Sequence, residues 1–236
     1  MKIDFTGQNI LITGGTKGIG KKLVDDYKKL GGNVWFTGRD KLLKNDNYFC
    51  VDFSDSRAMD TFTKEICELD IDILVNNAGT NKIGNIEEYD ISDYEKIINL
   101  NLTSCFKTTQ AIVPKMKTKK YGRIVNITSI SSFITMPLRS AYCSSKFGLL
   151  GLTKSSAVEL AKYNILINAV GPGVTQTELT VNVLGTKRMK EIAEKVPIKR
   201  LATVDDISTT VMFISSNLNT YIVGQNILVD GGYTCV

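Results

Sequence analysis

Three residues near the middle of the chain carry groups that acid–base chemistry needs: Ser129, Tyr142 and Lys146. Apolar residues recur at helical spacing from Phe147 to Leu160, so Tyr142 and Lys146 are expected one turn apart on one face of a long helix. A phenol has a pKa of about 10, and a fixed cation nearby favours its ionised form, which is one way to prepare a catalytic acid. Ser129 follows the predicted strand 124–127, where its hydroxyl could hydrogen-bond a substrate oxygen. Taken alone, Tyr-x-x-x-Lys is more often an amphipathic pair at a helix end, so the surrounding elements must decide.

The composition excludes several kinds of catalytic and metal site and indicates the cellular compartment of the protein. The 236 residues contain no histidine, which excludes a Ser-His-Asp triad, a Cys-His pair and a His-ligated metal, and we expect no metal site. The five cysteines are widely spaced without a C-x-x-C motif, so neither a disulfide framework nor zinc binding is expected. The net charge of +5 is mild, and no apolar run reaches membrane-spanning length. We therefore expect a reduced, cytoplasmic protein with one domain, residues 1–236, and with no nucleic-acid or membrane partner.

A glycine-rich loop follows the first predicted strand. The apolar run 9–13 leads into this loop, and a helical pattern from 21 to 30 comes next. Glycines let the backbone approach a pyrophosphate, and a helix N-terminus supplies N–H groups and a positive dipole. Strand, glycine loop and helix in this order predict a dinucleotide-binding site. Its candidate residues are Gly14, Thr16, Lys17, Gly18, Ile19 and Gly20.

The tip of the second predicted strand, 33–37, indicates which dinucleotide is bound. An acidic residue at that place would hold the ribose 2′-hydroxyl of NAD, but the chain has Gly38-Arg39. Arg39 together with Lys17 favours a 2′-phosphate, so NADP(H) is the predicted cofactor. Asp40 is near enough in sequence to compete, and the alternative is that Lys17 and Arg39 are solvated surface cations.

Further polar residues fall at the ends of predicted strands, where α/β sheets bind ligands. Asp52 closes the third strand and either accepts a hydrogen bond from an adenine amino group or forms a turn before Ser54. The tetrad Asn76-Asn77-Ala78-Gly79 follows the fourth strand, and Pro172-Gly173 ends the sixth. These positions extend the candidate site along the same edge of the sheet.

Two other segments complete the expected architecture. Asn101 lies within a helical pattern expected to begin at a Ser92 cap and to reach about Met116. An amide there has either a hydrogen-bonding task or a satisfied place in the core. The polar segment 174–197 is predicted to form a flap over the site. Strands alternate with helices throughout, which predicts one parallel sheet covered on both faces.

In combination, these elements resemble the short-chain dehydrogenase/reductase family over essentially the whole chain. The matching elements are Thr13-Gly14-x-x-x-Gly18-x-Gly20, Asp52, Asn76-Asn77-Ala78-Gly79, Asn101, Ser129, Tyr142-x-x-x-Lys146 and Pro172-Gly173-x-x-x-Thr177. The thirteen-residue step from Ser129 to Tyr142 is also usual in that family. The resemblance implies a single-domain, Rossmann-like, doubly wound parallel sheet of about seven strands. It also implies an oxidoreductase that transfers hydride between NADP(H) and a carbonyl or alcohol.

The resemblance assigns roles to individual residues. Tyr142 would be the general acid in ketone reduction, Ser129 would polarise the substrate carbonyl, and Lys146 would favour ionisation of the phenol and hold the nicotinamide ribose. Asn101 would anchor a water in a proton relay. The cofactor would be bordered by Asp52 and Phe53 at the adenine, and by Pro172, Gly173, Thr175 and Thr177 at the nicotinamide.

Within the family, the segments 196–206 and 221–232 are similar to those of 3-oxoacyl-acyl-carrier-protein reductases, so a 3-oxoacyl thioester on acyl carrier protein is the best substrate hypothesis. An acidic carrier protein could dock on Lys119, Lys120 and Lys162, although solvated lysines are the simpler interpretation. The family also implies a homotetramer, built through the helices that contain Asn101 and Tyr142.

The chain departs from the pattern of those reductases at two positions. They usually have Gln three residues before the catalytic Tyr, where this chain has Arg139, and Asn directly before it, where this chain has Ala141. Arg139 could pair with a carboxylate or phosphate of a different substrate, or it could be a surface arginine. A dehydrogenase of a sugar, polyol or nucleotide-linked sugar is therefore the alternative enzyme. An NADP-binding regulator without turnover is the alternative from another class, and the intact set of Asn101, Ser129, Tyr142 and Lys146 argues against it.

Overall fold

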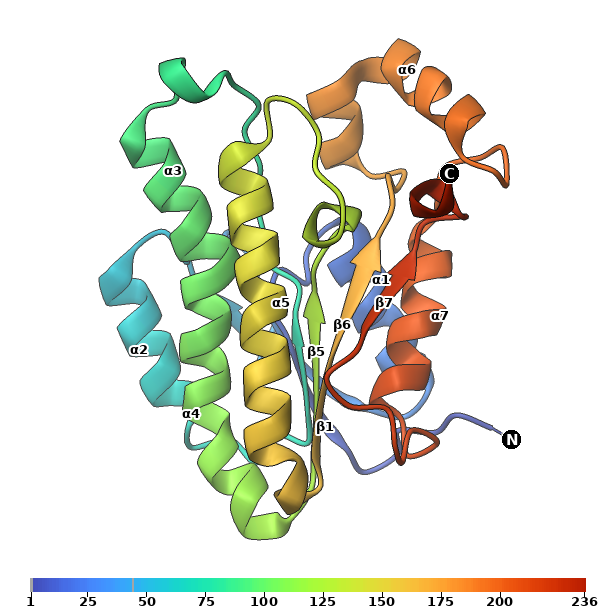
Figure 1. Cartoon of the computed structure of the whole chain (residues 1–236). Coiled ribbons are helices and arrows are strands. Elements are labelled where there is room, and N and C mark those ends of the chain that lie inside the picture. Colours follow the sequence, from blue (N-terminus) through green and yellow to red (C-terminus); the bar gives the residue numbers. More distant parts are fainter. Residues whose placement is uncertain (1, 44) are drawn as a thin grey trace.

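The computed structural model describes residues 2–43 and 45–236, and one parallel sheet runs through its centre (Figure 1). The seven strands lie in the order β3-β2-β1-β4-β5-β6-β7. They are β1 (Asn9–Ile12), β2 (Asn33–Gly38), β3 (Tyr48–Cys50), β4 (Ile73–Asn76), β5 (Gly122–Ile127), β6 (Ile165–Pro172) and β7 (Asn226–Val229). Every pairing is parallel, so each connection crosses a face of the sheet. The predicted Rossmann-like, doubly wound sheet is confirmed.

Helices cover both faces of the sheet. In Figure 1, α2, α4 and α5 lie on one side of the strands and α1 and α7 on the other, while α6 lies beyond the carboxyl end of β6. The helices are α1 (Gly18–Lys29), α2 (Ser56–Ile66), α3 (Ile91–Ile98), α4 (Ser104–Lys119), α5 (Ser140–Leu160), α6 (Glu178–Lys195) and α7 (Val204–Ser215). Short 3-10 turns are η1 (Ile86–Glu88), η3 (Ile130–Ser132), η4 (Ala161–Tyr163) and η5 (Tyr233–Cys235). No helix in the described ranges is long and apolar enough to cross a lipid bilayer.

Alternation along the strands divides the apolar residues between two cores. Successive strand side chains point to opposite faces, so β1 sends Ile10 and Ile12 toward α1 and α7, and Leu11 toward α2 and α4. Both faces are buried, which explains why the strands read as continuous apolar runs rather than as alternating patterns. The two cores hold the strands in one register, so their carboxyl ends meet at a single edge.

The expected helix from Ser92 to about Met116 is wrong in two respects. Asp90 is the N-cap, because its carboxylate accepts the backbone N–H of Ser92 at 2.8 Å. The helix is also interrupted by a π turn, η2 (Asn99–Thr103), which separates α3 from α4. Single π turns inside helices often mark functional positions, and this one contains Asn101.

Candidate active site

Tyr142 and Lys146 lie one turn apart near the start of α5, and the side chain of Lys146 reaches the carboxyl end of β5. Lys146 is 4% exposed, and its Nζ donates to the backbone carbonyl of Ile127 at 2.8 Å. The same Nζ lies 5.6 Å from the centroid of the Tyr142 ring. The spacing of four residues therefore places the phenol and the ammonium on one face, as the helical pattern predicts. Lys146 is therefore a buried cation beside the Tyr142 ring, with one carbonyl acceptor in the described chain.

Ser129 follows β5 by two residues and caps the short turn η3. Its Oγ accepts the backbone N–H of Ser131 at 3.1 Å, which uses an oxygen lone pair and leaves the hydroxyl proton for an outside acceptor. Its carbonyl accepts the N–H of Ser132 at 2.9 Å and the hydroxyl of Ser132 at 2.6 Å. The turn thus fixes the backbone of Ser129 and orients its hydroxyl.

Asn101 is fully buried in the π turn and uses both ends of its amide. Its Oδ1 accepts the N–H of Thr80 at 2.8 Å, and its Nδ2 donates to the carbonyl of Thr80 and to Ser145 Oγ. Ser145 Oγ in turn donates to the carbonyl of Tyr142 at 2.7 Å. This amide therefore joins the chain after β4 to the turn of α5 that carries Tyr142. Ser145 was missed as a site residue, although its place in the Tyr142-x-x-x-Lys146 turn was a usable signal.

Gly79 lies where these elements converge. A Cβ at Gly79 would stand 3.4 Å from Asn101 Oδ1 and 3.8 Å from Lys146 Nζ. The structure therefore brings the end of β4, the π turn and α5 to one place, as the sequence predicts for Gly79, Asn101 and Lys146.

The glycine loop between β1 and α1 is packed against the end of β4. Gly14 has a φ of 69°, which favours glycine, and a Cβ at Gly20 would stand only 2.1 Å from the carbonyl oxygen of Gly14. Asn77 Nδ2 donates to the carbonyls of Thr13 and Gly14 at 2.9 and 3.1 Å. Asn77 therefore has a structural role beside its predicted role toward a cofactor, because its amide holds the glycine loop against the end of β4.

The start of α1 fits a pyrophosphate. Lys17 is the N-cap residue in an extended conformation, and no side chain caps the first N–H groups of the helix. Gly18 follows with a φ of 53°, and Ile19 begins the face that packs on the core. Thr16 packs beside the tip of β2, since a Cβ at Gly38 would stand 2.4 Å from Thr16 Cγ2. This loop lies between β1 and β4, where the strand order reverses and doubly wound sheets bind dinucleotides.

Arg39 and Lys17, the two cations predicted to hold a 2′-phosphate, are both exposed. Arg39 is exposed just beyond β2, and Lys17 makes an exposed ion pair with Glu178 at 3.2 Å. The carboxylate of Asp40, a residue that could have favoured NAD, accepts the N–H of Leu42 at 2.9 Å and so stabilises the turn that follows β2.

Asp52 and Phe53 contribute less to the site surface than expected. Asp52 Oδ1 accepts the N–H and the hydroxyl of Ser54 at 2.9 and 2.7 Å, which is the turn-forming alternative. These hydrogen bonds, with Arg39 as a weaker influence, hold the pKa of Asp52 below its ordinary value. The Phe53 ring packs in the core against Phe62, with ring centroids 5.5 Å apart, so a contact with an adenine would come from its backbone.

The residues after β6 reach back to the glycine loop. Gly173 N–H donates to the carbonyl of Val229 at 2.9 Å, following Pro172 at the end of β6. Thr175 Oγ1 donates to the carbonyl of Gly173 at 3.0 Å. Thr177 caps α6, and a Cβ at Gly18 would stand 3.3 Å from its methyl carbon. The predicted nicotinamide-side residues therefore adjoin the predicted phosphate-side loop.

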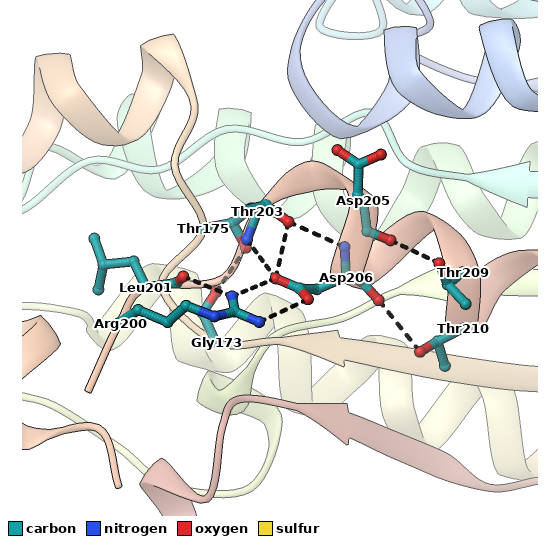
Figure 2. Close-up of polar contacts among 9 residues, drawn as sticks. All are labelled: Gly173, Thr175, Arg200, Leu201, Thr203, Asp205, Asp206, Thr209 and Thr210. Carbon is teal, nitrogen blue, oxygen red and sulfur yellow. Dashed lines mark hydrogen bonds and ion pairs between the residues drawn. The ribbon is translucent and has the colours of Figure 1, made fainter. Parts of the chain in front are cut away.

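Both ends of the segment 174–197 are fastened at one place (Figure 2). Thr175 forms an isolated parallel β-bridge with Ala202. Arg200 makes two hydrogen bonds to the carboxylate of Asp206, at 2.6 and 3.0 Å, and Asp206 also accepts the N–H of Thr203 at 2.7 Å. Helix α6 lies between these anchors and is broken at Gly185, which has a φ of 72°.

Arg139 lines a cavity, and Lys119 is already paired with carboxylates. Arg139 lines a cavity of about 350 Å³ between segments 84–87 and 135–143, and the lining includes neither Ser129 nor Tyr142. Lys119 binds Asp70 and Asp72 at 2.7 and 2.6 Å, so two carboxylates neutralise it and remove it from the expected basic patch.

The site combines a glycine loop that fits a dinucleotide, the buried ammonium of Lys146 and the oriented hydroxyl of Ser129. Together these features define a dinucleotide-dependent oxidoreductase. A family model described as enoyl-(acyl carrier protein) reductase matches residues 14–234. The 3-oxoacyl-[acyl-carrier-protein] reductase FabG of Rickettsia typhi is 36% identical over 99% of this chain and 100% of the relative. The FabG of Aquifex aeolicus is 34% identical over 98% of this chain and 99% of the relative. The chain belongs to the short-chain dehydrogenase/reductase family, and it is an NADP-dependent oxidoreductase.

Solved structures agree with this assignment. A Beutenbergia cavernae protein described as an NAD(P)-dependent gluconate 5-dehydrogenase, with bound NADP, has a TM-score of 0.93 at 27% identity, covering 99% of each chain. ElxO with bound NADP has a TM-score of 0.87 at 30% identity, covering 97% of this chain and 99% of the other.

Proposed function

We propose that the protein reduces the ketone of a 3-oxoacyl thioester on acyl carrier protein, using NADPH and Tyr142 as the proton donor. The observation that carries the proposal is the Ser129 hydroxyl, oriented by Ser131 N–H only two residues beyond Ile127, whose carbonyl accepts the ammonium of Lys146 beside the Tyr142 ring. The curated relatives named FabG, aligned over the full chain, support the substrate class.

The chemistry follows from three side chains. When bound, the cofactor supplies hydride to the carbonyl carbon. Ser129 donates a hydrogen bond to the carbonyl oxygen, and the phenol of Tyr142 gives its proton to that oxygen as negative charge develops. The ammonium of Lys146, held by the Ile127 carbonyl, stabilises the phenolate that remains. Asn101, with its amide engaged by Thr80 and Ser145, holds the tyrosine-bearing turn of α5 in place, and its role in a water relay stays a prediction.

Segment 174–197 acts as the lid over this site in the proposal. Its ends are fixed by the Thr175–Ala202 bridge and the Arg200–Asp206 pair, while Gly185 divides α6 between them. A segment fastened at both ends and broken in the middle can move over a bound substrate without detaching from the sheet.

The proposed acyl carrier protein would dock on Lys120 and Lys162, without Lys119. Helices α4 and α5 leave Phe106, Phe147 and Val158 exposed, which supports a homotetramer built through them. In this arrangement one domain, 1–236, forms each subunit.

A second candidate is a dehydrogenase of an anionic sugar. It is favoured by Arg139, a residue that lines the cavity of about 350 Å³ at the start of α5 and has no ion-pair partner among the described residues. A solved structure described as a gluconate 5-dehydrogenase is similar over the full chain, which supports this class.

The deciding assay follows oxidation of NADPH and NADH in parallel with an acetoacetyl thioester as substrate. We expect rapid oxidation of NADPH and little of NADH. If protein that binds NADPH oxidises neither cofactor, the thioester assignment is wrong, and gluconate-type substrates should then be compared in wild-type protein and Arg139→Ala.

A further inference from the structure

A side chain from the last strand reaches the turn that contains Ser129. Asn226 Oδ1 accepts the hydroxyl of Thr128 at 2.9 Å, and Asn226 Nδ2 donates to Ser132 Oγ at 3.0 Å. Ser132 Oγ then donates to the carbonyl of Ser129 at 2.6 Å. The amide of Asn226 therefore hydrogen-bonds to the residue directly before Ser129 and to the residue three positions after it.

The sheet leaves room for this contact at one glycine. β6 lies between β5 and β7, so the amide of Asn226 must pass over β6 to reach the turn after β5. A Cβ at Gly171 would stand 2.7 Å from Leu228 Cδ2, and it would also crowd Asn226 Oδ1 at 3.2 Å and the carbonyl oxygen of Ser129 at 3.3 Å. Glycine at 171 thus opens the path by which Asn226 reaches the turn.

The direction of the hydrogen bonds requires an amide. Ser132 has one hydroxyl proton, and because that proton goes to the Ser129 carbonyl, its oxygen must accept from a donor. Asn226 Nδ2 is this donor, and an aspartate of the same shape would present only acceptors. Thr128 and Ser132 are 2% and 1% exposed, so water does not readily replace a lost partner.

We propose that Asn226 is a positioning residue that acts through Ser132 to fix the backbone, and hence the hydroxyl, of Ser129. The inference rests on the proposed role of Ser129 as the group that polarises the carbonyl. Small displacements of such a group lower the rate of the chemical step more than the binding of substrate.

The test is a double-mutant cycle measured with NADPH and an acetoacetyl thioester. Asn226→Ala should lower kcat about three- to tenfold, while KM and the Kd for NADPH stay within about twofold. In a Ser129→Ala background, the same change should have no further effect on the residual kcat, because the group that it positions is gone. Asn226→Asp should behave like Asn226→Ala, since it removes the donor.

The control is Asn168→Ala. Asn168 is a buried amide on β6 that donates to the carbonyl of Ile222 and accepts Gln225 N–H, and among the described residues its side chain makes no hydrogen bond to Thr128, Ser129, Ser132 or the side chain of Asn226. It should lower the melting temperature and leave kcat unchanged. If Asn226→Ala does not fold, Ser132→Ala breaks the same link and should show the same loss of kcat and the same dependence on Ser129.

Two results would overturn the inference: an unchanged kcat in Asn226→Ala, or equal losses of kcat with and without Ser129. An unchanged kcat in Ser129→Ala alone would instead reject the proposed function, so the two failures are distinguishable.

Discussion

The ammonium of Lys17 lies 3.2 Å from the carboxylate of Glu178, and this pair joins the glycine loop to the first turn of α6. Both side chains are about three-quarters exposed, at 78% and 75%, so the pair itself contributes at most about 1 kcal/mol. Because a 2′-phosphate needs the same ammonium, we expect Glu178→Gln to strengthen NADPH binding about two- to fivefold and to leave NADH binding unchanged. Fluorescence titration of both cofactors measures this.

The matched control for that variant is Glu191→Gln. Glu191 also forms an exposed pair within α6, with Arg188 at 3.2 Å, but neither residue touches the glycine loop. Its NADPH affinity should equal that of the wild type. Equal gains in both variants would mean that net charge, and not competition for Lys17, sets the affinity.

Removing the phenolic hydroxyl of Tyr142 should separate catalysis from cofactor binding. Tyr142→Phe keeps the ring 5.6 Å from Lys146 Nζ but removes the proposed proton donor, so turnover should fall by about 10² or more. The Kd for NADPH should stay within about twofold of wild type. Turnover retained at the wild-type rate would reject Tyr142 as the general acid.

Two glycine substitutions should have opposite effects. In Gly20→Ala, the new Cβ would stand 2.1 Å from the Gly14 carbonyl, so the loop must shift; we expect loss of NADPH binding and a lower melting temperature. Gly151, inside α5, has no atom within 4 Å of an added Cβ, so Gly151→Ala should stabilise the monomer by about 0.5–1 kcal/mol. Calorimetry and NADPH titration test both. Normal NADPH binding by Gly20→Ala would refute the steric argument.

The Arg200–Asp206 pair should make the anchor of α6 sensitive to acid. Hydrogen bonds from Arg200, and then from Thr203, hold the pKa of Asp206 far below its ordinary value, which is about 4. A carboxyl with a lowered folded-state pKa stabilises the fold above its unfolded-state pKa, and this contribution is lost as the pH falls toward the folded-state value.

Asp206→Asn should therefore lower the free energy of unfolding by about 1 kcal/mol at pH 7, because it removes the ion pair and weakens the capping box with Thr203. The difference from wild type should shrink as the pH falls below about 4, where the wild-type carboxylate begins to lose its charge-dependent stabilisation. Urea denaturation from pH 3 to 7 measures this. A constant difference across that range would show that the charge of Asp206 is unimportant.

The cysteines should differ sharply in reactivity. Burial raises the pKa of Cys105 to about 11, whereas Cys50 and Cys235 are exposed. At pH 8, iodoacetamide should label Cys50 and Cys235 within minutes and leave Cys105 intact until urea unfolds the chain. Mass spectrometry of the labelled peptides gives the order, and early labelling of Cys105 would contradict the packing of α4.

Local patterns account for the parts of the site that the sequence predicts well. The loop from Gly14 to Gly20 lies directly between its own strand and helix, and Tyr142 and Lys146 share a helix face because their spacing is four residues. The parallel sheet follows from alternating strand and helix patterns. The loop and the Tyr–Lys pair depend on contacts between residues close in sequence, and the sheet depends on a pattern that repeats along the whole chain, so spacing and period are sufficient.

Long-range contacts account for the rest. The pairing of Lys119 with Asp70 and Asp72, of Lys17 with Glu178, and of Asn226 with the Ser129 turn each joins segments far apart in the chain. Side chains of these types have no preferred partner until the sheet order sets their neighbours. The sequence alone therefore determines the fold class, the cofactor loop and the Tyr–Lys pair. The tertiary structure decides which charges are already neutralised and which side chains hold Ser129, because those outcomes depend on which strand ends are brought to the same edge.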